Sequence, residues 1–204
     1  MSEAERVLNH GADGFGVLAI ASSAGGLQAL SRVLSELPAE FPVPVLIVQH
    51  LDPRHETVIA EIMARRTGLA VKLAQHGEAA RPGMVYFAPL DRHLLAEEDG
   101  HLALTQSALV HFVRPSADLL FESVAGSYGH RAIACVLSGS GTDGAMGVSA
   151  VQARGGTVLV QNPATADFKG MPEAAAATGA ADLVLELDEI APALIGLTES
   201  GPRR

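Results

Sequence analysis

Short aliphatic runs alternate with helix-like segments along most of this chain. The runs are almost entirely apolar, which is typical of parallel strands buried on both faces of a sheet. They lie at residues 17–21, 43–49, 71–74, 84–88, 132–137, 157–160 and 183–187. Helical patterns lie between them, at about residues 27–37, 56–66, 115–128, 144–154 and 172–178, and from residue 190 onward. This alternation predicts an α/β fold, a doubly wound and mostly parallel sheet with helices on both faces.

One pair of runs departs from this order. Leu94–Ala96 and Leu102–Leu104 flank the polar turn Glu98–Gly100. They predict a small antiparallel hairpin, inserted around residues 84–105. The helix that follows is expected to begin near Pro115, because proline is favourable in the first turn of a helix.

The predicted elements belong to one domain. A chain of 204 residues is the right size for a single domain with its own core. No low-complexity linker or internal repeat interrupts residues 15–197. Residues 1–14 and 198–204 are expected to be short tails.

The composition is that of an ordinary globular protein, with 48% hydrophobic and 18% charged residues. Cys135 is the single cysteine, so the chain has neither an internal disulfide nor a cysteine-rich zinc cluster, and a reducing, cytoplasmic location is expected. No apolar run is long enough to cross a membrane, and residues 1–10 lack the apolar centre of a signal peptide. The net charge of −9 argues against nucleic-acid binding.

Three reactive side chains come after three of the predicted strands. Ser23 and His50 each follow an apolar strand, and Asp143 lies in the glycine-rich loop after another. Loops at the carboxyl ends of parallel strands share one edge of the sheet, so these residues are expected to meet there as the parts of an acyl-transfer site. Ala24 and Gly25 follow Ser23 at the start of a helix, where N–H groups favour a developing oxyanion.

Each of the three residues also has a plainer interpretation. Ser23 suits a helix N-cap, His50 suits a structural or solvent-facing histidine, and Asp143 suits a cap for the helix that starts at Gly144. Their joint occurrence at strand ends favours the catalytic interpretation over these separate ones.

Two arginines and one loop are further candidates. Arg92 lies in a turn before the hairpin and is a candidate for substrate contact, and Arg114 is a candidate for binding a carboxylate. The loop Gly139–Gly144 matches the dinucleotide fingerprint G-x-G-x-x-G between a strand and a helix. The acidic residue that this fingerprint requires after the next strand is replaced by Gln161-Asn162-Pro163. A nucleotide-binding α/β protein stays open as an alternative.

Six short segments of the chain form a recognisable set. They are AIASSAGG at 19–26, IVQH at 47–50, APLDRH at 88–93, RPSADLLF at 114–121, LSGSGTDGA at 137–145 and GMP at 170–172. Taken together, these segments resemble the catalytic domain of the protein-glutamate methylesterases of bacterial chemotaxis. They occur in that family's order, and the resemblance covers about residues 15–197.

The resemblance implies that Ser23 is the nucleophile, His50 the base and Asp143 the orienting acid. It also implies hydrolysis of glutamate methyl esters on methyl-accepting chemotaxis receptors with release of methanol, and deamidation of receptor glutamines. No metal or organic cofactor is expected.

Departures from the family pattern concern substrate positioning and regulation. Ser140 stands where methionine is frequent beside the oxyanion site, and a backbone N–H contribution survives that change. Ala24 replaces a common threonine. Family members often carry an N-terminal receiver domain, for which residues 1–14 are too few. We therefore expect a stand-alone enzyme, constitutive or controlled by a partner chain. A catalytically weak regulatory binding module of the same fold is the other alternative.

Overall fold

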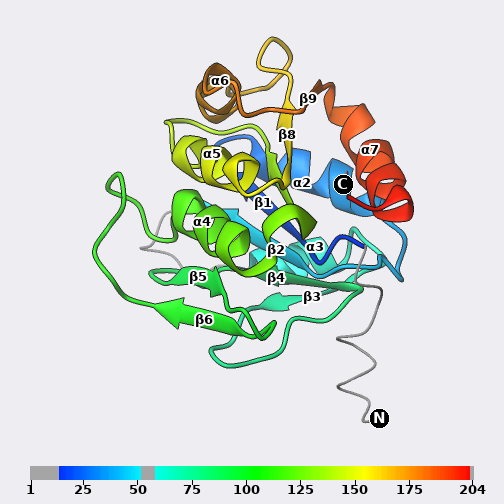
Figure 1. Cartoon of the computed structure of the whole chain (residues 1–204), viewed down its shortest axis with the longest axis vertical. Helices are drawn as coiled ribbons and strands as arrows, with labels where there is room; N and C mark the ends of the chain where they lie inside the picture. Colours follow the sequence, from blue (N-terminus) through cyan, green and yellow to red (C-terminus); the bar gives the residue numbers. More distant parts are fainter. Residues whose placement is uncertain (1–13, 52–57, 203–204) are drawn as a thin grey trace.

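Parallel strands form the central sheet of the computed structural model, which describes residues 14–51 and 58–202 (Figure 1). This seven-stranded sheet has the order β3-β4-β2-β1-β7-β8-β9, and each neighbouring pair is parallel. Its strands are β1 (Val17–Ser22), β2 (Val45–Gln49), β3 (Ala70–Leu73), β4 (Met84–Phe87), β7 (Ala132–Val136), β8 (Thr157–Gln161) and β9 (Leu183–Leu185). The predicted fold class is confirmed.

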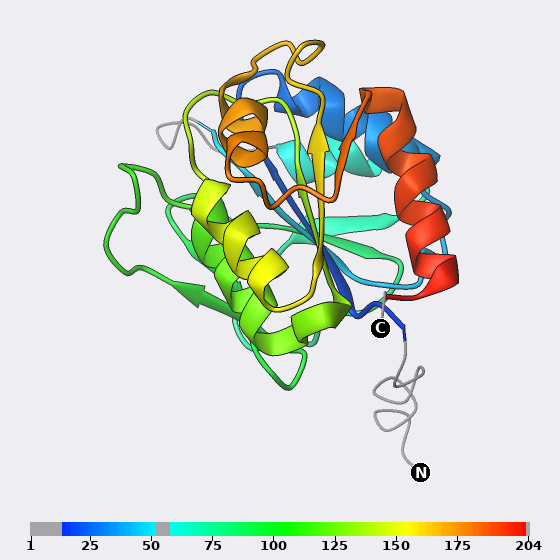
Figure 2. The ribbon, with the colours of Figure 1, turned by 45° about the horizontal axis from the view of Figure 1, so that its top comes forward.

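Helices cover both faces of the sheet, which lies between two helical layers in Figure 2. One layer consists of α2 (Gly26–Glu36), α3 (Ile59–Ala64) and α7 (Leu187–Ser200), and the other of α4 (Ala117–Tyr128), α5 (Ala145–Ala153) and α6 (Gly170–Ala177). A short 3-10 turn, η1 (Gly129–Arg131), leads from α4 into β7. Successive side chains of a strand point to opposite faces, so Leu18 and Ile20 pack under α2 and α7 while the smaller Ala19 and Ala21 face α4.

The predicted antiparallel hairpin is confirmed. It consists of β5 (His93–Ala96) and β6 (Leu102–Thr105), which form a separate two-stranded sheet. The hairpin is attached to α4, because the N–H of Ala96 donates to the hydroxyl of Ser123 at 3.0 Å. Strand β4, which was expected at the border of the insertion, pairs with β2 and β3 in the main sheet.

Two predicted helix starts are wrong. Helix α4 begins at Ala117 with Ser116 as its N-cap, so Pro115 precedes the helix and does not lie in its first turn. Helix α7 begins at Leu187, before the expected Ile190, because Glu186 and Glu189 form a capping box there.

Helix ends differ as well. Helix α7 continues to Ser200, so Thr198–Ser200 is helical and does not belong to a tail. Helix α3 ends at Ala64, and its expected start at residue 56 lies outside the described residues, as does the expected tail over residues 1–13. Within the described part of the chain, none of the helices combines the length and apolar character that crossing a bilayer requires.

Candidate active site

The register of two adjacent strands places Ser23 beside His50. Ser22 of β1 pairs with Gln49 of β2, so the next residue of each strand, Ser23 and His50, leaves the sheet at the same level. Neighbouring strands lie about 4.8 Å apart. The N–H of His50 also donates to the carbonyl of Ser22 at 3.0 Å, which continues the ladder to this point.

A buried amide, which the sequence did not single out, fixes both backbones. Gln49 is 6% exposed, and its Oε1 accepts the hydroxyl of Ser22 at 2.6 Å. Its Nε2 donates to the carbonyl of Ser23 at 2.8 Å and to that of His50 at 2.9 Å. The available signal was a polar residue that ends an otherwise apolar strand, directly before the candidate histidine.

His50 is bonded to the third candidate residue. Its Nε2 lies 2.9 Å from Oδ2 of Asp143, and the histidine side chain is 13% exposed and the aspartate side chain 4% exposed. Because the ionised carboxylate only accepts hydrogen bonds, Nε2 carries the proton of this bond and Nδ1 is left as the acceptor nitrogen. A ring nitrogen with a free lone pair is what a general base requires.

The Asp143 carboxylate lies at the N-terminus of α4. Oδ1 accepts the hydroxyl of Ser116 at 2.9 Å and the N–H of Asp118 at 3.1 Å, and Oδ2 accepts the N–H of Ala117 at 2.6 Å. Burial by itself would raise the pKa of Asp143. The hydrogen bonds from His50 and from the N–H groups of α4 outweigh burial and hold the pKa of this carboxyl below its ordinary value.

A second carboxylate makes the reverse connection between the same two helices. Asp118, in the first turn of α4, accepts the N–H of Gly144 at 2.9 Å and that of Gly147 at 2.7 Å through Oδ1. Burial raises the pKa of Asp118, and the nearby charge of Asp143 acts in the same direction. Asp143, in the loop before α5, therefore binds the N-terminus of α4, and Asp118 of α4 binds the N-terminus of α5. These reciprocal bonds hold the loop that carries Asp143.

These reciprocal bonds weaken the nucleotide-binding alternative for Gly139–Gly144. A dinucleotide fingerprint uses the N–H groups at the start of the following helix to bind phosphate. Here the N–H groups of Gly144 and Gly147 already bind the carboxylate of Asp118. The loop is thus built around an internal anion.

The backbone around Ser23 is tightly held by the same loop. The N–H of Ser23 donates to the carbonyl of Ser138 at 3.0 Å, and the hydroxyl of Ser138 donates to the carbonyl of Ala24 at 3.0 Å. Gly25 has φ +71°, and a Cβ there would lie 2.7 Å from Oγ of Ser138, so only glycine fits. Ala24 and Gly25 directly precede α2, whose positive end favours an anion beside Ser23.

Comparison with known proteins shows which family this chain matches. The model of a protein family described as CheB methylesterase matches residues 18–194. This chain belongs to the CheB methylesterase family.

Relatives in the CheB methylesterase family share this domain. The chain is 43% identical over 185 residues to protein-glutamate methylesterase/protein-glutamine glutaminase 1 of Paramagnetospirillum magneticum, over 89% of the chain and 49% of the relative. A putative protein-glutamate methylesterase/protein-glutamine glutaminase of Leptospira interrogans is 36% identical, over 90% of the chain and 95% of the relative. The crystal structure of the Thermotoga maritima CheB methylesterase catalytic domain is 35% identical with a TM-score of 0.85, covering 89% of the chain and 98% of that domain.

The share of each relative that is covered differs. The chain spans about half the length of the Paramagnetospirillum relative and 44% of a Moorella thermoacetica relative that is 40% identical. The activities and substrates of these longer relatives are therefore proposals for this chain.

The remaining predicted residues lie in different environments. Ser140 is exposed in the loop before Asp143, and Arg92 is exposed before β5. Arg114 donates through Nε at 2.9 Å and Nη2 at 2.6 Å to Oδ1 of Asp91. Its Nη1 donates to backbone carbonyls of the loop before it. Arg114 is therefore engaged in contacts within the fold, and its role towards a substrate carboxylate stays a prediction.

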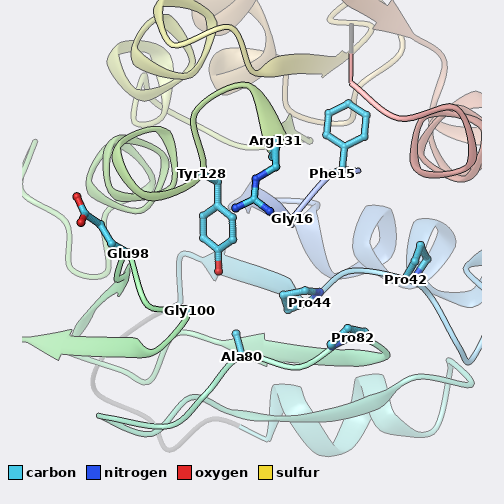
Figure 3. A pocket seen from close by; sticks show the side chains of 10 residues that line it. All are labelled: Phe15, Gly16, Pro42, Pro44, Ala80, Pro82, Glu98, Gly100, Tyr128 and Arg131. Carbon is cyan, nitrogen blue, oxygen red and sulfur yellow. The ribbon is translucent and has the colours of Figure 1, made fainter. Parts of the chain in front are cut away.

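One cavity of the CheB methylesterase domain adjoins His50. It has a volume of about 350 Å³, and its lining residues are His50, Leu51, Asp91, Leu109, Phe112, Val113, Arg114 and Pro115. Another cavity, of about 140 Å³, lies at the opposite edge of the sheet, where Tyr128, Arg131 and several prolines surround it (Figure 3), and it contains none of the predicted site residues. Among the described residues, no group of three or more His, Cys, Asp or Glu side chains is placed to hold a metal ion.

Proposed function

We propose that this chain hydrolyses methyl esters of glutamate side chains in methyl-accepting chemotaxis receptors, with Ser23 as the nucleophile. The observation that carries the proposal is the 2.9 Å bond between His50 and Asp143, beside the serine that the strand register brings to His50. The names of the relatives supply the substrate class.

The proposed reaction begins with a proton transfer within the site. Nδ1 of His50 takes the proton of the Ser23 hydroxyl while Oγ attacks the ester carbonyl carbon. The negative oxygen of the tetrahedral intermediate faces the backbone N–H groups of Ala24 and Gly25 at the start of α2. His50 then gives the proton to the methoxy oxygen, and methanol leaves.

The second half of the reaction restores the enzyme. Water, deprotonated by Nδ1 of His50, attacks the acyl-enzyme, and Ser23 leaves with the proton that the imidazole returns. The products are a free glutamate carboxylate and the starting hydroxyl. Asp143 stabilises the imidazolium in both halves, and its low pKa keeps it ionised near neutral pH.

The same acyl-enzyme can form from a glutamine side chain with release of ammonia. The relatives' names combine both activities, and the proposal includes deamidation of receptor glutamines. We propose residues 15–197 as the catalytic domain and the receptor as its protein partner. The single cysteine, Cys135, is buried and fits a reducing compartment, so we place the reaction in the cytoplasm.

The test is methanol release from methylated chemoreceptors in membranes, compared between the native chain and Ser23→Ala. We expect Ser23→Ala to lower the rate by about 10⁴-fold or more, because the nucleophile and base act as a unit. Ser35→Ala is the matched control, since Ser35 is an exposed residue of α2 whose hydroxyl bonds only its own helix.

Two results would contradict the proposal. Activity retained in Ser23→Ala would exclude Ser23 as the nucleophile. No methanol from a folded native chain that still binds the receptor would favour a regulatory binding module instead.

A further inference from the structure

A loop beside His50 presents large apolar side chains to solvent. The loop runs from residue 106 to 115, between β6 and α4. Leu109 is 54% exposed and Phe112 is 94% exposed. Exposed apolar residues grouped in one place usually mark a binding surface.

These residues border the cavity that adjoins His50. Leu51, Leu109, Phe112, Val113 and Pro115 supply apolar lining, and His50 lines the same cavity. Its volume of about 350 Å³ is enough for a large side chain. Because His50 is also the proposed base, a group bound here lies next to the reacting ester.

The charged groups of the cavity already have partners. Both Nε and Nη2 of Arg114 bind Asp91, and the pair holds the pKa of Asp91 below its ordinary value. A charged ligand would have to compete with this ion pair, whereas an apolar side chain would not. The lining therefore favours an apolar occupant.

The loop is anchored before any ligand arrives. Nη1 of Arg114 donates to the carbonyl of Gln106 at 3.3 Å and to that of Ser107 at 2.6 Å. Nε2 of the buried His93 bonds the carbonyl of Ala108 at 3.1 Å. A binding surface that is held in place loses little conformational entropy when it binds.

The tip of the loop adopts a conformation that does not suit its residues. Val110 and Val113 exchange backbone hydrogen bonds at 2.9 and 3.2 Å, and the two residues between them, His111 and Phe112, have φ +48° and +65°. Turns with two such residues favour Asn-Gly, and a bulky residue in this region is an outlier. Since Phe112 is almost fully exposed, burial within the chain does not explain it. An outlier of this kind points to function.

We propose that the cavity binds a leucine-, methionine- or phenylalanine-sized side chain of the protein segment that carries the glutamyl ester. This inference rests on the proposed function, and it names a recognition element for that reaction. The occupant belongs to the substrate because His50, the proposed catalytic base, lines the cavity.

The experiment uses short, soluble peptides with one central glutamate methyl ester in an alanine and serine background. Each peptide carries a single leucine at a different position, and the reference peptide carries serine there. We expect a leucine at one position to raise kcat/KM about tenfold over the reference, as for filling an apolar pocket.

Two variants test whether the cavity is responsible. Phe112→Gly and Leu109→Ser should each bring the ratio of kcat/KM between the leucine and reference peptides towards one. Glycine suits the positive φ at residue 112, so Phe112→Gly should not lower the melting temperature. Val184→Ser removes another half-exposed apolar side chain, 49% exposed in β9, and should leave the ratio unchanged.

The outcomes separate this inference from the proposed function. Hydrolysis of all peptides at equal rates would overturn the cavity proposal and leave the esterase proposal standing. A leucine preference that persists in both loop variants would also overturn it. Self-association of the native chain in sedimentation that is lost in Phe112→Gly would overturn it too, because a second copy would then occupy the surface. No hydrolysis of any peptide, together with no methanol from receptors, would overturn the proposed function itself.

Discussion

The Asp143 carboxylate both caps a helix and bonds the candidate histidine, two roles that the sequence presented as alternatives. It binds the N-terminus of α4 and also bonds His50. The helix that it caps is not the one expected, because the start of α5 at Gly144 is bonded by Asp118. Capping and orientation of the histidine are compatible here because a carboxylate has enough lone pairs for several donors.

His93 makes the stability of this region depend on pH. The residue is fully buried, its Nδ1 accepts the N–H of Ser116 at 3.1 Å, and its Nε2 bonds the carbonyl of Ala108. An acceptor Nδ1 requires the neutral imidazole. Burial lowers the pKa of His93 from its ordinary value of 6.5, so the folded chain binds fewer protons at this site than the unfolded chain does.

The sign of the pH dependence follows. The stability that His93 contributes is complete above pH 6.5 and is lost as the pH falls through the lower folded pKa. We expect the urea midpoint to fall on acidification from about pH 8 to about pH 5, and His93→Gln to reduce that fall. His130→Gln, at an exposed histidine of η1, is the control. An unchanged pH profile in His93→Gln would contradict the assignment.

At the scale of elements, α4 and α5 pack closely because one glycine allows it. A Cβ on Gly147 would lie 2.6 Å from Cβ of Phe121 and 3.0 Å from the backbone of Asp118. The two carboxylate caps, from Asp118 and Asp143, span the same interface. The distance between the helices is therefore tied to the position of the proposed site.

A pair of glycine substitutions tests this packing. Gly147→Ala should lower the free energy of unfolding by about 1–3 kcal/mol through overpacking. Gly126→Ala, in α4 where nothing beyond the adjacent helix backbone lies within 4 Å of the added Cβ, should raise it by about 0.5–1 kcal/mol. Urea denaturation of both variants provides the comparison. Equal effects of one sign would show that backbone propensity, not helix contact, decides the cost.

At the scale of the whole molecule, the central strands are sealed on both sides. Cys135 lies in β7 between β1 and β8 and has no exposed surface. Burial raises the pKa of its thiol to about 12. Both features make the thiol unreactive while the sheet is intact.

Thiol labelling should therefore report opening of the central sheet. We expect Cys135 to resist a maleimide reagent in the native state and to react at a rate that follows the population of the unfolded chain as urea increases. Gly147→Ala should label faster than the native chain by the factor by which it raises the unfolded population, about tenfold for each 1.4 kcal/mol of stability lost. Rapid labelling without denaturant would show that β7 is accessible through local opening.

The sequence by itself determined the sheet and its working edge. Apolar runs such as Val45–Gln49 are buried on both faces, which requires a helical layer on each side of the sheet. The local pattern is therefore enough to predict parallel strands. The carboxyl ends of such strands then meet at one edge, which brought Ser23, His50 and Asp143 together as candidates. Helix starts were less predictable where a long-range or reciprocal cap decided them, as at Leu187.

Only the tertiary structure decided which polar groups bond one another. The N–H of Asp118 bonds the carboxylate of Asp143 across 25 residues, and the guanidinium of Arg114 bonds Asp91 across 23 residues. These hydrogen-bond partners depend on the distance between two packed elements and on which polar groups lose contact with water when the elements pack. The hydrophobic pattern of the sequence predicts which face of each element is buried, but it predicts neither that distance nor those polar groups.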